Sequence, residues 1–183
     1  MASPSAFATA LATHGGRGPL GPRAPLEVRP DDANRRWHLV PYDQLSASIG
    51  PLADCPPDAA GIVLVECPAK AARRPYHRQK LALLLTSMRH FAVEQAARGV
   101  AVVVLVDDSY AAAATRAAAA FGPLTMMRPA ERELRVELAP LVAAGTLREV
   151  PHAGWLTTSA EFAAWAGPKA PWRMDAFYRG ARR

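Results

Sequence analysis

Cysteine is scarce in this chain of 183 residues, which contains only Cys55 and Cys67. Two thiolates are too few for an iron–sulfur cluster of the usual four-cysteine kind, and their spacing matches no zinc-binding signature. We therefore expect two reduced thiols in a cytoplasmic protein that has no metal site of its own.

Long apolar runs are also missing. The longest, residues 100–106, has the length of a strand and falls well short of the ~18–20 residues that a membrane helix needs, so we expect no membrane partner. Residues 1–30 are rich in Ala, Ser, Pro, Gly and Arg and lack the compact apolar stretch of a secretory signal. Residues 1–35 are therefore predicted to be a disordered leader.

The motifs of the common nucleotide enzymes are lacking as well. No G-x-G-x-x-G follows the first predicted strand at residues 37–40, and no G-x-x-x-x-G-K-[ST] occurs. These absences argue against an ordinary dinucleotide enzyme and against a P-loop NTPase. The G-x-S-x-G elbow and the H-E-x-x-H motif are missing too, so a hydrolase or transferase of the wider nucleotide-binding α/β class has little support.

The sequence does contain a regular alternation of strand-like and helical segments. Residues 61–67 (GIVLVEC) and 100–106 are continuous apolar runs, typical of strands that are buried on both faces of a parallel sheet. The predicted strands are 37–40, 61–67, 100–106, 124–127 and 146–150, and the predicted helices are 77–98, 110–121, 129–144, 160–166 and 175–183. Such alternation predicts an α/β fold over residues 36–183: a doubly wound, five-stranded parallel sheet of Rossmann-like type with a C-terminal helical tail.

Polar residues follow the first strand, at the edge where ligands bind in sheets of this type. Asp43 and Gln44 place a carboxylate next to an amide, and together these groups offer the acceptors and donors that a ligand's heterocycle needs. An aspartate in such a loop also serves commonly as a turn or cap residue. Both interpretations of this pair stay open at this point.

Glu66 ends a strand that is otherwise apolar, so its carboxylate must be solvated in a cleft or paired. Candidate partners are His77, Arg78 and Lys80, at the start of the next helix. Cationic side chains oppose the dipole at a helix N-terminus, which favours a nearby acid. Glu66 is therefore one candidate for the acid that compensates these cations.

The formal net charge of the chain is +6, and positive charge is concentrated at the C-terminal end. After residue 168, Asp175 is the one acid among five basic residues, which are Lys169, Arg173, Arg179, Arg182 and Arg183. Four aromatic residues lie among or close to them: Trp165, Trp172, Phe177 and Tyr178. Such a cluster can stack nucleic-acid bases, or it can pin a terminal helix to a neighbouring domain, and we favour the second interpretation.

Three groups of segments resemble one protein family. Residues 42–46 (YDQLS) are similar to the family's G-D-Q-L-S, and residues 77–91 contain counterparts of H-x-x-K-[IL] and S-A-M-R-H-F. Residues 159–166 (SAEFAAWA) and 173–179 (RMDAFYR) resemble S-x-x-E-F-x-x-W-A and R-M-E-x-F-Y-R. The resemblance covers residues 37–183. It is to the N-terminal α/β domain of the photolyase-related proteins, which include the prokaryotic (6-4) photolyases, or iron–sulfur cryptochrome-photolyases.

The resemblance implies a larger protein. Full members join this domain to a helical domain that holds FAD, a [4Fe-4S] cluster with four cysteines and the pocket for the DNA lesion. Light excites the flavin, which passes an electron to the damaged pyrimidine pair. This chain is expected to be truncated before that domain, to carry no catalytic residue and to meet DNA only indirectly. A separately encoded flavin domain is the expected partner, docking on Trp172, Phe177 and Tyr178, which should be partly exposed.

The N-terminal domain of characterised family members houses an antenna chromophore, 6,7-dimethyl-8-ribityllumazine. The resemblance implies that Asp43, Gln44 and Glu66 are the cofactor-binding residues of this chain, because they match the family's positions. FAD and the [4Fe-4S] cluster are expected only in the helical domain.

Other positions depart from the family pattern around this antenna site. Lys70 and Arg73 stand where the family has an acid and an aromatic residue, and Tyr42 replaces a glycine. Arg128 lies in a segment, residues 127–132 (MRPAER), that replaces T-E-P-G-E-W. These cations and bulky side chains predict a weakened or lost lumazine site. The alternative hypothesis is a stand-alone α/β module that binds a small heterocycle or nucleotide at the strand ends, or a partner protein.

Overall fold

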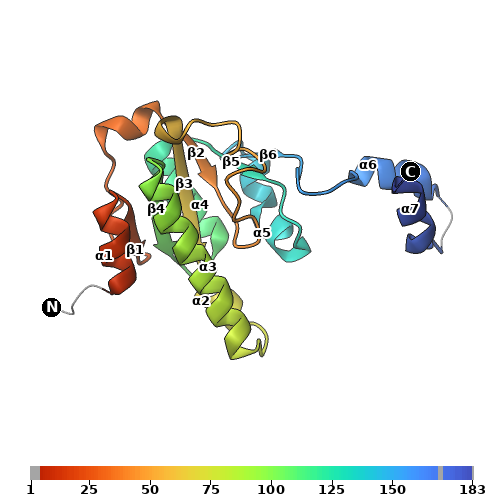
Figure 1. Cartoon of the computed structure of the whole chain (residues 1–183), viewed down its shortest axis with the longest axis horizontal. Helices are drawn as coiled ribbons and strands as arrows, with labels where there is room; N and C mark the ends of the chain where they lie inside the picture. Colours follow the sequence, from red (N-terminus) through yellow and green to blue (C-terminus); the bar gives the residue numbers. More distant parts are fainter. Residues whose placement is uncertain (1–4, 169–170, 183) are drawn as a thin grey trace.

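A computed structural model of the protein describes residues 5–168 and 171–182. Within these residues, one parallel sheet has the strand order β1-β4-β3-β2-β5-β6 (Figure 1). The strands are β1 (Arg17–Leu20), β2 (Arg36–Leu39), β3 (Ala60–Glu66), β4 (Ala101–Val106), β5 (Leu124–Met127) and β6 (Leu147–Val150). The order reverses between β2 and β5, so the switch point of this doubly wound sheet lies there.

The predicted α/β class and the parallel, doubly wound arrangement are confirmed. The five predicted strands are β2 to β6, and each pairs with its neighbours in parallel register. The described part of the sheet has six strands rather than five, because β1 pairs in parallel with β4 at one edge.

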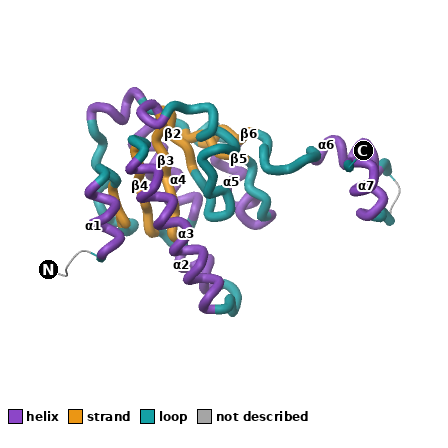
Figure 2. Tube along the Cα trace, in the orientation of Figure 1, coloured by secondary structure: helices purple, strands orange, loops and turns teal. Residues whose placement is uncertain are grey.

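Helices cover both faces of the sheet (Figure 2). They are α1 (Ala6–Thr13), α2 (Pro68–Ala72), α3 (Arg78–Ala97), α4 (Tyr110–Phe121), α5 (Arg132–Ala143), α6 (Ser159–Ala166) and α7 (Met174–Ala181), with short 3-10 turns η1 (Pro30–Asn34) and η2 (Pro57–Ala59). Side chains of α1 and α3 pack on one face, and side chains of α4 and α5 pack on the other. Alanines of α4 bring that helix close to the sheet, which suits an alanine-rich core.

The prediction of a disordered leader over residues 1–35 is wrong for residues 5–35, which contain α1, β1 and η1. Residues 1–4 lie outside the described part of the chain. Leu11 of α1 is fully buried against the sheet face that α3 also covers. Gly18 is required in β1, because a Cβ at this position would lie 2.3 Å from the Val104 carbonyl oxygen and its φ is +122°.

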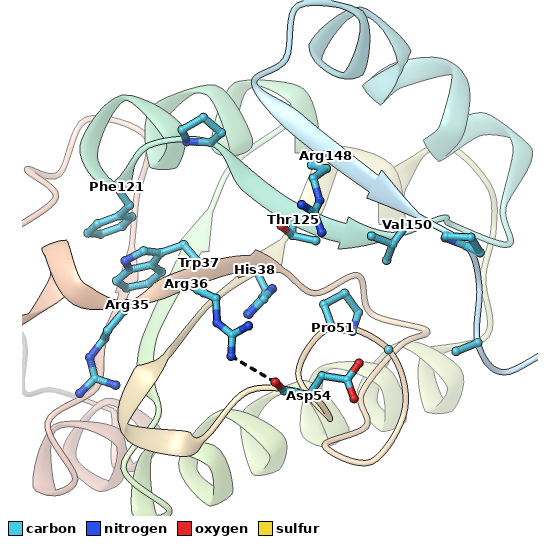
Figure 3. Close-up of a pocket in the computed structure, with 14 residues that line it drawn as sticks. Arg35, Arg36, Trp37, His38, Pro51, Asp54, Phe121, Thr125, Arg148 and Val150 are labelled. Atoms are coloured by element: carbon cyan, nitrogen blue, oxygen red, sulfur yellow. Dashed lines mark hydrogen bonds between the residues drawn. The ribbon is translucent and has the colours of Figure 1, made fainter.

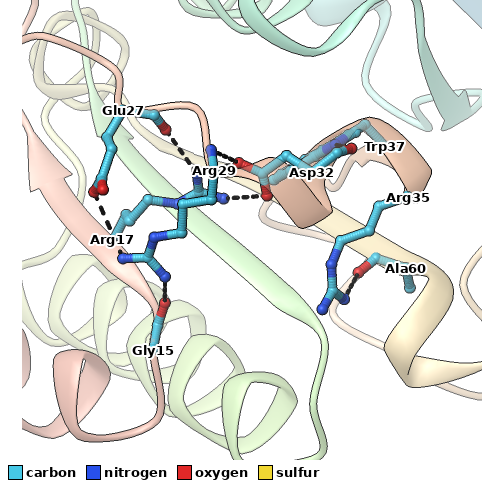
Figure 4. A network of polar contacts seen from close by, with 8 residues as sticks. All are labelled: Gly15, Arg17, Glu27, Arg29, Asp32, Arg35, Trp37 and Ala60. Atoms are coloured by element: carbon cyan, nitrogen blue, oxygen red, sulfur yellow. Dashed lines mark hydrogen bonds and ion pairs between the residues drawn. The ribbon is translucent and has the colours of Figure 1, made fainter.

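A buried ion pair holds β1 in place, which explains why a segment with so few apolar residues is ordered (Figure 4). The Arg17 guanidinium donates to both carboxylate oxygens of Asp32, at 2.6 and 3.0 Å, and lies over the ring of Trp37. Burial alone would raise the pKa of Asp32, but hydrogen bonds from Arg17 and from the backbone N–H of Arg29 outweigh it, and the pKa lies below its ordinary value.

The C-terminal pair of helices, α6 and α7, stands away from the α/β layers (Figure 1). Thr158 caps α6, and Glu161 completes a capping box by accepting from the Thr158 backbone N–H at 2.6 Å. Phe162, Trp165 and Phe177 pack together between the two helices, with ring centroids 5.1 to 5.9 Å apart. The two helices therefore form a small aromatic unit of their own, the α6–α7 unit.

Candidate functional site

The edge formed by the carboxyl ends of the strands is where ligands are expected to bind in this fold. Tyr42 and Asp43 reach it from the loop after β2, Lys70 from α2, and Glu131 from the residue before α5. These side chains are far apart in the sequence but meet in the fold, because the carboxyl ends of parallel strands lie at the same edge of the sheet.

Tyr42, Lys70 and Glu131 form one hydrogen-bonded group at this edge, the crevice group. The Tyr42 hydroxyl donates to Glu131 Oε2 at 2.9 Å, and Lys70 Nζ donates to the same oxygen at 2.5 Å. Lys70 Nζ also lies 5.6 Å from the centre of the Tyr42 ring. Burial, strengthened by the bond to Glu131, raises the pKa of Tyr42, so its hydroxyl stays protonated and keeps donating. The crevice group ties α2 to the start of α5.

Asp43 lies beside this group and is the best-placed of the predicted site residues for contact with a ligand. The residue is exposed overall, and its carboxylate makes no side-chain hydrogen bond within the described residues. Partial burial of the carboxyl raises the pKa of Asp43, and the charge of Glu131 raises it further, while His152 and Lys70 act in the opposite direction. An acceptor with a raised pKa at the rim of the crevice can bind a donor of a heterocycle.

Gln44 is buried and holds the switch point together. Its Nε2 donates to the backbone carbonyls of Met127 and Arg128, both at 3.2 Å. These bonds join the loop after β2 to the end of β5, where the sheet has few backbone bonds of its own because β2 and β5 register at one pair, His38 with Thr125. The amide nitrogen of Gln44 is thus engaged with the protein.

Glu66 pairs with a cation other than those that the sequence suggested. Both of its carboxylate oxygens accept from Arg89 of α3, from Nε at 2.7 Å and from Nη2 at 2.9 Å. This bidentate bond raises the pKa of Arg89. His77 instead caps α3, where its Nδ1 accepts from the Gln79 N–H at 3.3 Å. Glu66 is therefore not the acid that compensates the cations at the start of α3, since the end of β3 faces α3 further along, at Arg89.

The strand alternation also separates Glu66 from the crevice group. Glu66 lies on the same face as Ile62 and Leu64, which pack under α3. Lys70 and Glu131, by contrast, meet between α2 and the start of α5. The structure therefore brings Asp43 next to the crevice group, but it directs Glu66 towards Arg89.

The remaining cations at this edge are paired elsewhere or exposed. Arg128 Nη1 donates to Glu149 of β6 at 2.8 Å, and Arg73 is exposed at the end of α2. Neither the Lys70–Glu131 pair nor the part played by His152 could be found from sequence periodicity. The sequence did contain one sign of the Lys70–Glu131 pair, because Lys70 stands where the family has an acid. The structure explains this replacement, since Lys70 binds Glu131.

The N-terminus of α4, which follows β4, is filled by the protein's own groups. Ser109 Oγ accepts from the Ala112 N–H at 3.2 Å, and Glu137 of α5 accepts from the Ala111 N–H at 3.2 Å and from Ser109 Oγ at 3.0 Å. A carboxylate thus stands where an anionic ligand would bind a helix N-terminus. Residues 16–21 have the spacing G-x-G-x-x-G, but they span β1 and form no phosphate loop.

Metal binding has no support in residues 5–168 and 171–182, where no group of three or more His, Cys, Asp and Glu side chains is arranged to hold an ion. Among the helices of this described part, none is long and apolar enough to cross a membrane.

Comparison with known proteins assigns the chain to a family. The family model of the deoxyribodipyrimidine photo-lyase-related proteins matches residues 38–183. The chain is also similar to a (6-4) photolyase of Agrobacterium fabrum, with 30% identity over 155 residues, which cover 79% of this chain and 31% of that protein. The chain thus spans about a third of the length of this relative. It belongs to the photolyase-related family.

Proposed function

We propose that this chain, as a member of the photolyase-related family, serves as the α/β domain of a light-dependent DNA-repair flavoprotein. In this proposal it works with a helical domain that carries FAD and a [4Fe-4S] cluster. The chain itself supplies no lyase or redox residue and meets DNA only through that partner. The exposed aromatic surface of the α6–α7 unit is the observation that carries the proposal.

The α6–α7 unit presents more aromatic surface than two short helices can bury. Trp172 and Tyr178 are 48% and 60% exposed, and Phe177 is partly exposed. The expected exposure of these three residues is confirmed. Trp165 and Met174 add to the same surface, at 43% and 46%. Contiguous apolar surface of this kind is typical of an interface. Lys169 and Arg183, two of the five basic tail residues, lie outside the described residues.

We propose that the antenna site at the strand ends is weakened. Of the three residues that resemblance assigns to the chromophore, Gln44 directs its amide nitrogen to β5 and Glu66 is held by Arg89. Of the two carboxylates among these three residues, only that of Asp43 has no side-chain partner within the described residues. Where a ligand would need open polar groups, Lys70 and Glu131 already bind each other.

Co-expression with a helical flavin domain tests the docking proposal. The probe is a helical domain of the photolyase-related family, and bound FAD reports whether it has folded. We expect the two chains to co-purify at equal stoichiometry with flavin absorption. The triple variant of Trp172, Phe177 and Tyr178 to alanine should lose the complex, because it removes the aromatic anchors.

Trp155→Ala is the matched control, since Trp155 is 62% exposed but lies before α6, outside the aromatic unit. This variant should bind like the wild type. If the flavin-loaded domain fails to bind the wild-type chain, or binds the triple variant equally well, the proposed role of α6 and α7 is wrong.

A stand-alone binding module is the second candidate function, and the exposed carboxylate of Asp43 favours it. In that case the chain would take a small heterocycle at the crevice without any flavin domain. Asp43→Asn would then weaken binding of the heterocycle, whereas the triple variant of Trp172, Phe177 and Tyr178 would not.

A further inference from the structure

A cavity lies on the sheet face that α1 and α3 only partly cover. It has a volume of about 650 Å³ and is open to solvent beside β2, β5 and β6 (Figure 3). Its lining includes His38 and Thr125, the arginines Arg36 and Arg148, and the apolar residues Phe121 and Pro123. This volume is within the range of small-molecule sites. The cavity is separate from the crevice group, none of whose residues lines it.

His38 is the residue that marks this cavity as more than a surface depression. It is 5% exposed, yet neither Nδ1 nor Nε2 has a hydrogen-bond partner. Buried polar groups are almost always paired, so an unpaired imidazole in a cavity wall points to a partner outside the chain. Burial, with a smaller effect from the charge of Arg36, lowers the pKa of His38 to about 4. The ring is therefore neutral at physiological pH and offers one N–H donor and one acceptor.

Positive charge exceeds negative charge around the cavity, which is lined by three arginines and by one acid, Asp54. Arg148 is exposed and makes no hydrogen bond or ion pair within the described residues. Arg36 Nη2 donates to the backbone carbonyl of Asp54 at 3.1 Å, and the other nitrogens of its guanidinium have no partner in that part of the chain. Arg35 behaves differently, because its Nη1 donates to three backbone carbonyls and it serves the fold.

We propose that this cavity binds a small organic phosphate with a flat heterocycle, of the size of a nucleoside monophosphate. The two arginines, Arg36 and Arg148, take the phosphate, since guanidinium groups bind phosphate oxygens in bidentate fashion. Thr125 hydrogen-bonds the polar edge of the heterocycle, and His38 does so once its ring, whose nitrogens are covered in the free chain, turns into the cavity. Pro123 receives the face of the heterocycle beside Phe121, whose ring is stacked on Trp37 with the centroids 3.8 Å apart. The proposal is independent of any chromophore at the crevice and of the docking of a flavin domain.

Binding of the four ribonucleoside 5′-monophosphates to the whole chain tests this proposal, with inorganic phosphate and adenosine as partial ligands. Isothermal titration calorimetry gives the affinity, and the ¹⁵N shifts of the His38 ring report contact. We expect at least one nucleotide to bind and to shift both His38 nitrogens. Phosphate and adenosine alone should bind more weakly. Arg148→Ala should weaken nucleotide binding about tenfold or more, because a charge-assisted pair is lost.

Two variants keep the result interpretable. Arg78→Ala removes an exposed arginine at the start of α3, outside the cavity, and should bind like the wild type. His38→Leu fills a similar volume without polar atoms; it should keep the fold and lose binding about tenfold. The proposal is overturned if no nucleotide binds at millimolar concentration, which would mean that His38 meets only water. It is equally overturned if Arg148→Ala and Arg78→Ala weaken binding alike.

Discussion

Removing Arg89 should destabilise the protein through Glu66. Glu66 has a side chain that is only 9% exposed, whereas that of Arg89 is 40% exposed. The variant Arg89→Ala leaves a buried carboxylate without its bidentate partner. Breaking a fully buried pair costs about 3–5 kcal/mol. Solvent screening at the half-exposed arginine reduces that figure, and we expect a loss of about 2 kcal/mol in the free energy of unfolding.

Thermal and urea unfolding, followed by circular dichroism, measure this loss. For a chain of this size, about 2 kcal/mol corresponds to a decrease in Tm of about 4–8 °C. Glu66→Gln keeps the shape and one acceptor, so it should cost about 1 kcal/mol. The double variant should be no less stable than Arg89→Ala, because the unpaired charge has been removed as well.

Arg78→Ala serves as the control, as it removes the same charge from the same helix at an exposed position. It should change the stability by less than about 0.5 kcal/mol. If the effects of Arg89→Ala and Glu66→Gln simply add in the double variant, the two side chains do not act as a pair. Glu66 would then be available to a ligand, and its bond to Arg89 would contribute nothing to the stability of the fold.

Two further variants test pH dependence. The folded-state pKa of Asp32 is depressed, so its stabilisation is present above the unfolded value near 3.8 and lost as pH falls through the folded one. The destabilisation by Asp32→Asn should therefore be large at pH 7 and shrink below pH 4 in unfolding experiments. The pKa of His38 falls from 6.5 to about 4 on folding, so the wild type should lose up to about 3 kcal/mol relative to His38→Leu between those pH values. If the difference in stability between the wild type and Asp32→Asn, or between the wild type and His38→Leu, does not change with pH, the shifted pKa of that residue is refuted.

The elements that could be predicted are those whose signal is local. Residues 61–67 are apolar almost throughout because β3 is covered on both faces, and the strand follows directly from that run. The helix over residues 77–98 has the spacing of a helix that packs one side on a sheet, and α3 confirms it. The parallel arrangement then follows from the alternation of strands and helices, since consecutive parallel strands require crossovers.

The elements that were missed depend on contacts between distant residues. Strand β1 is stabilised by Arg17 and Asp32, 15 positions apart, and not by an apolar run. The partner of Glu66 is 23 positions away, and Lys70 meets Glu131 across 61 positions. In each case the sequence alone predicts a surface position for a charged residue. Only the fold shows that an oppositely charged partner lies close enough for the residue to be buried or partly buried.

Chromophore binding at the crevice group can be measured directly. Fluorescence and absorption titration with 6,7-dimethyl-8-ribityllumazine should compare the wild type with the triple variant Tyr42→Gly, Lys70→Glu and Arg73→Tyr, which restores the family's residue types at these three positions. We predict that the wild type binds the lumazine weakly or not at all and that the variant binds it at least about tenfold more tightly. The variant removes Tyr42 and Lys70, the two side chains that occupy the Glu131 carboxylate. Tight, stoichiometric binding by the wild type, or a purified chain that already carries a lumazine, would contradict the proposal that the antenna site is weakened.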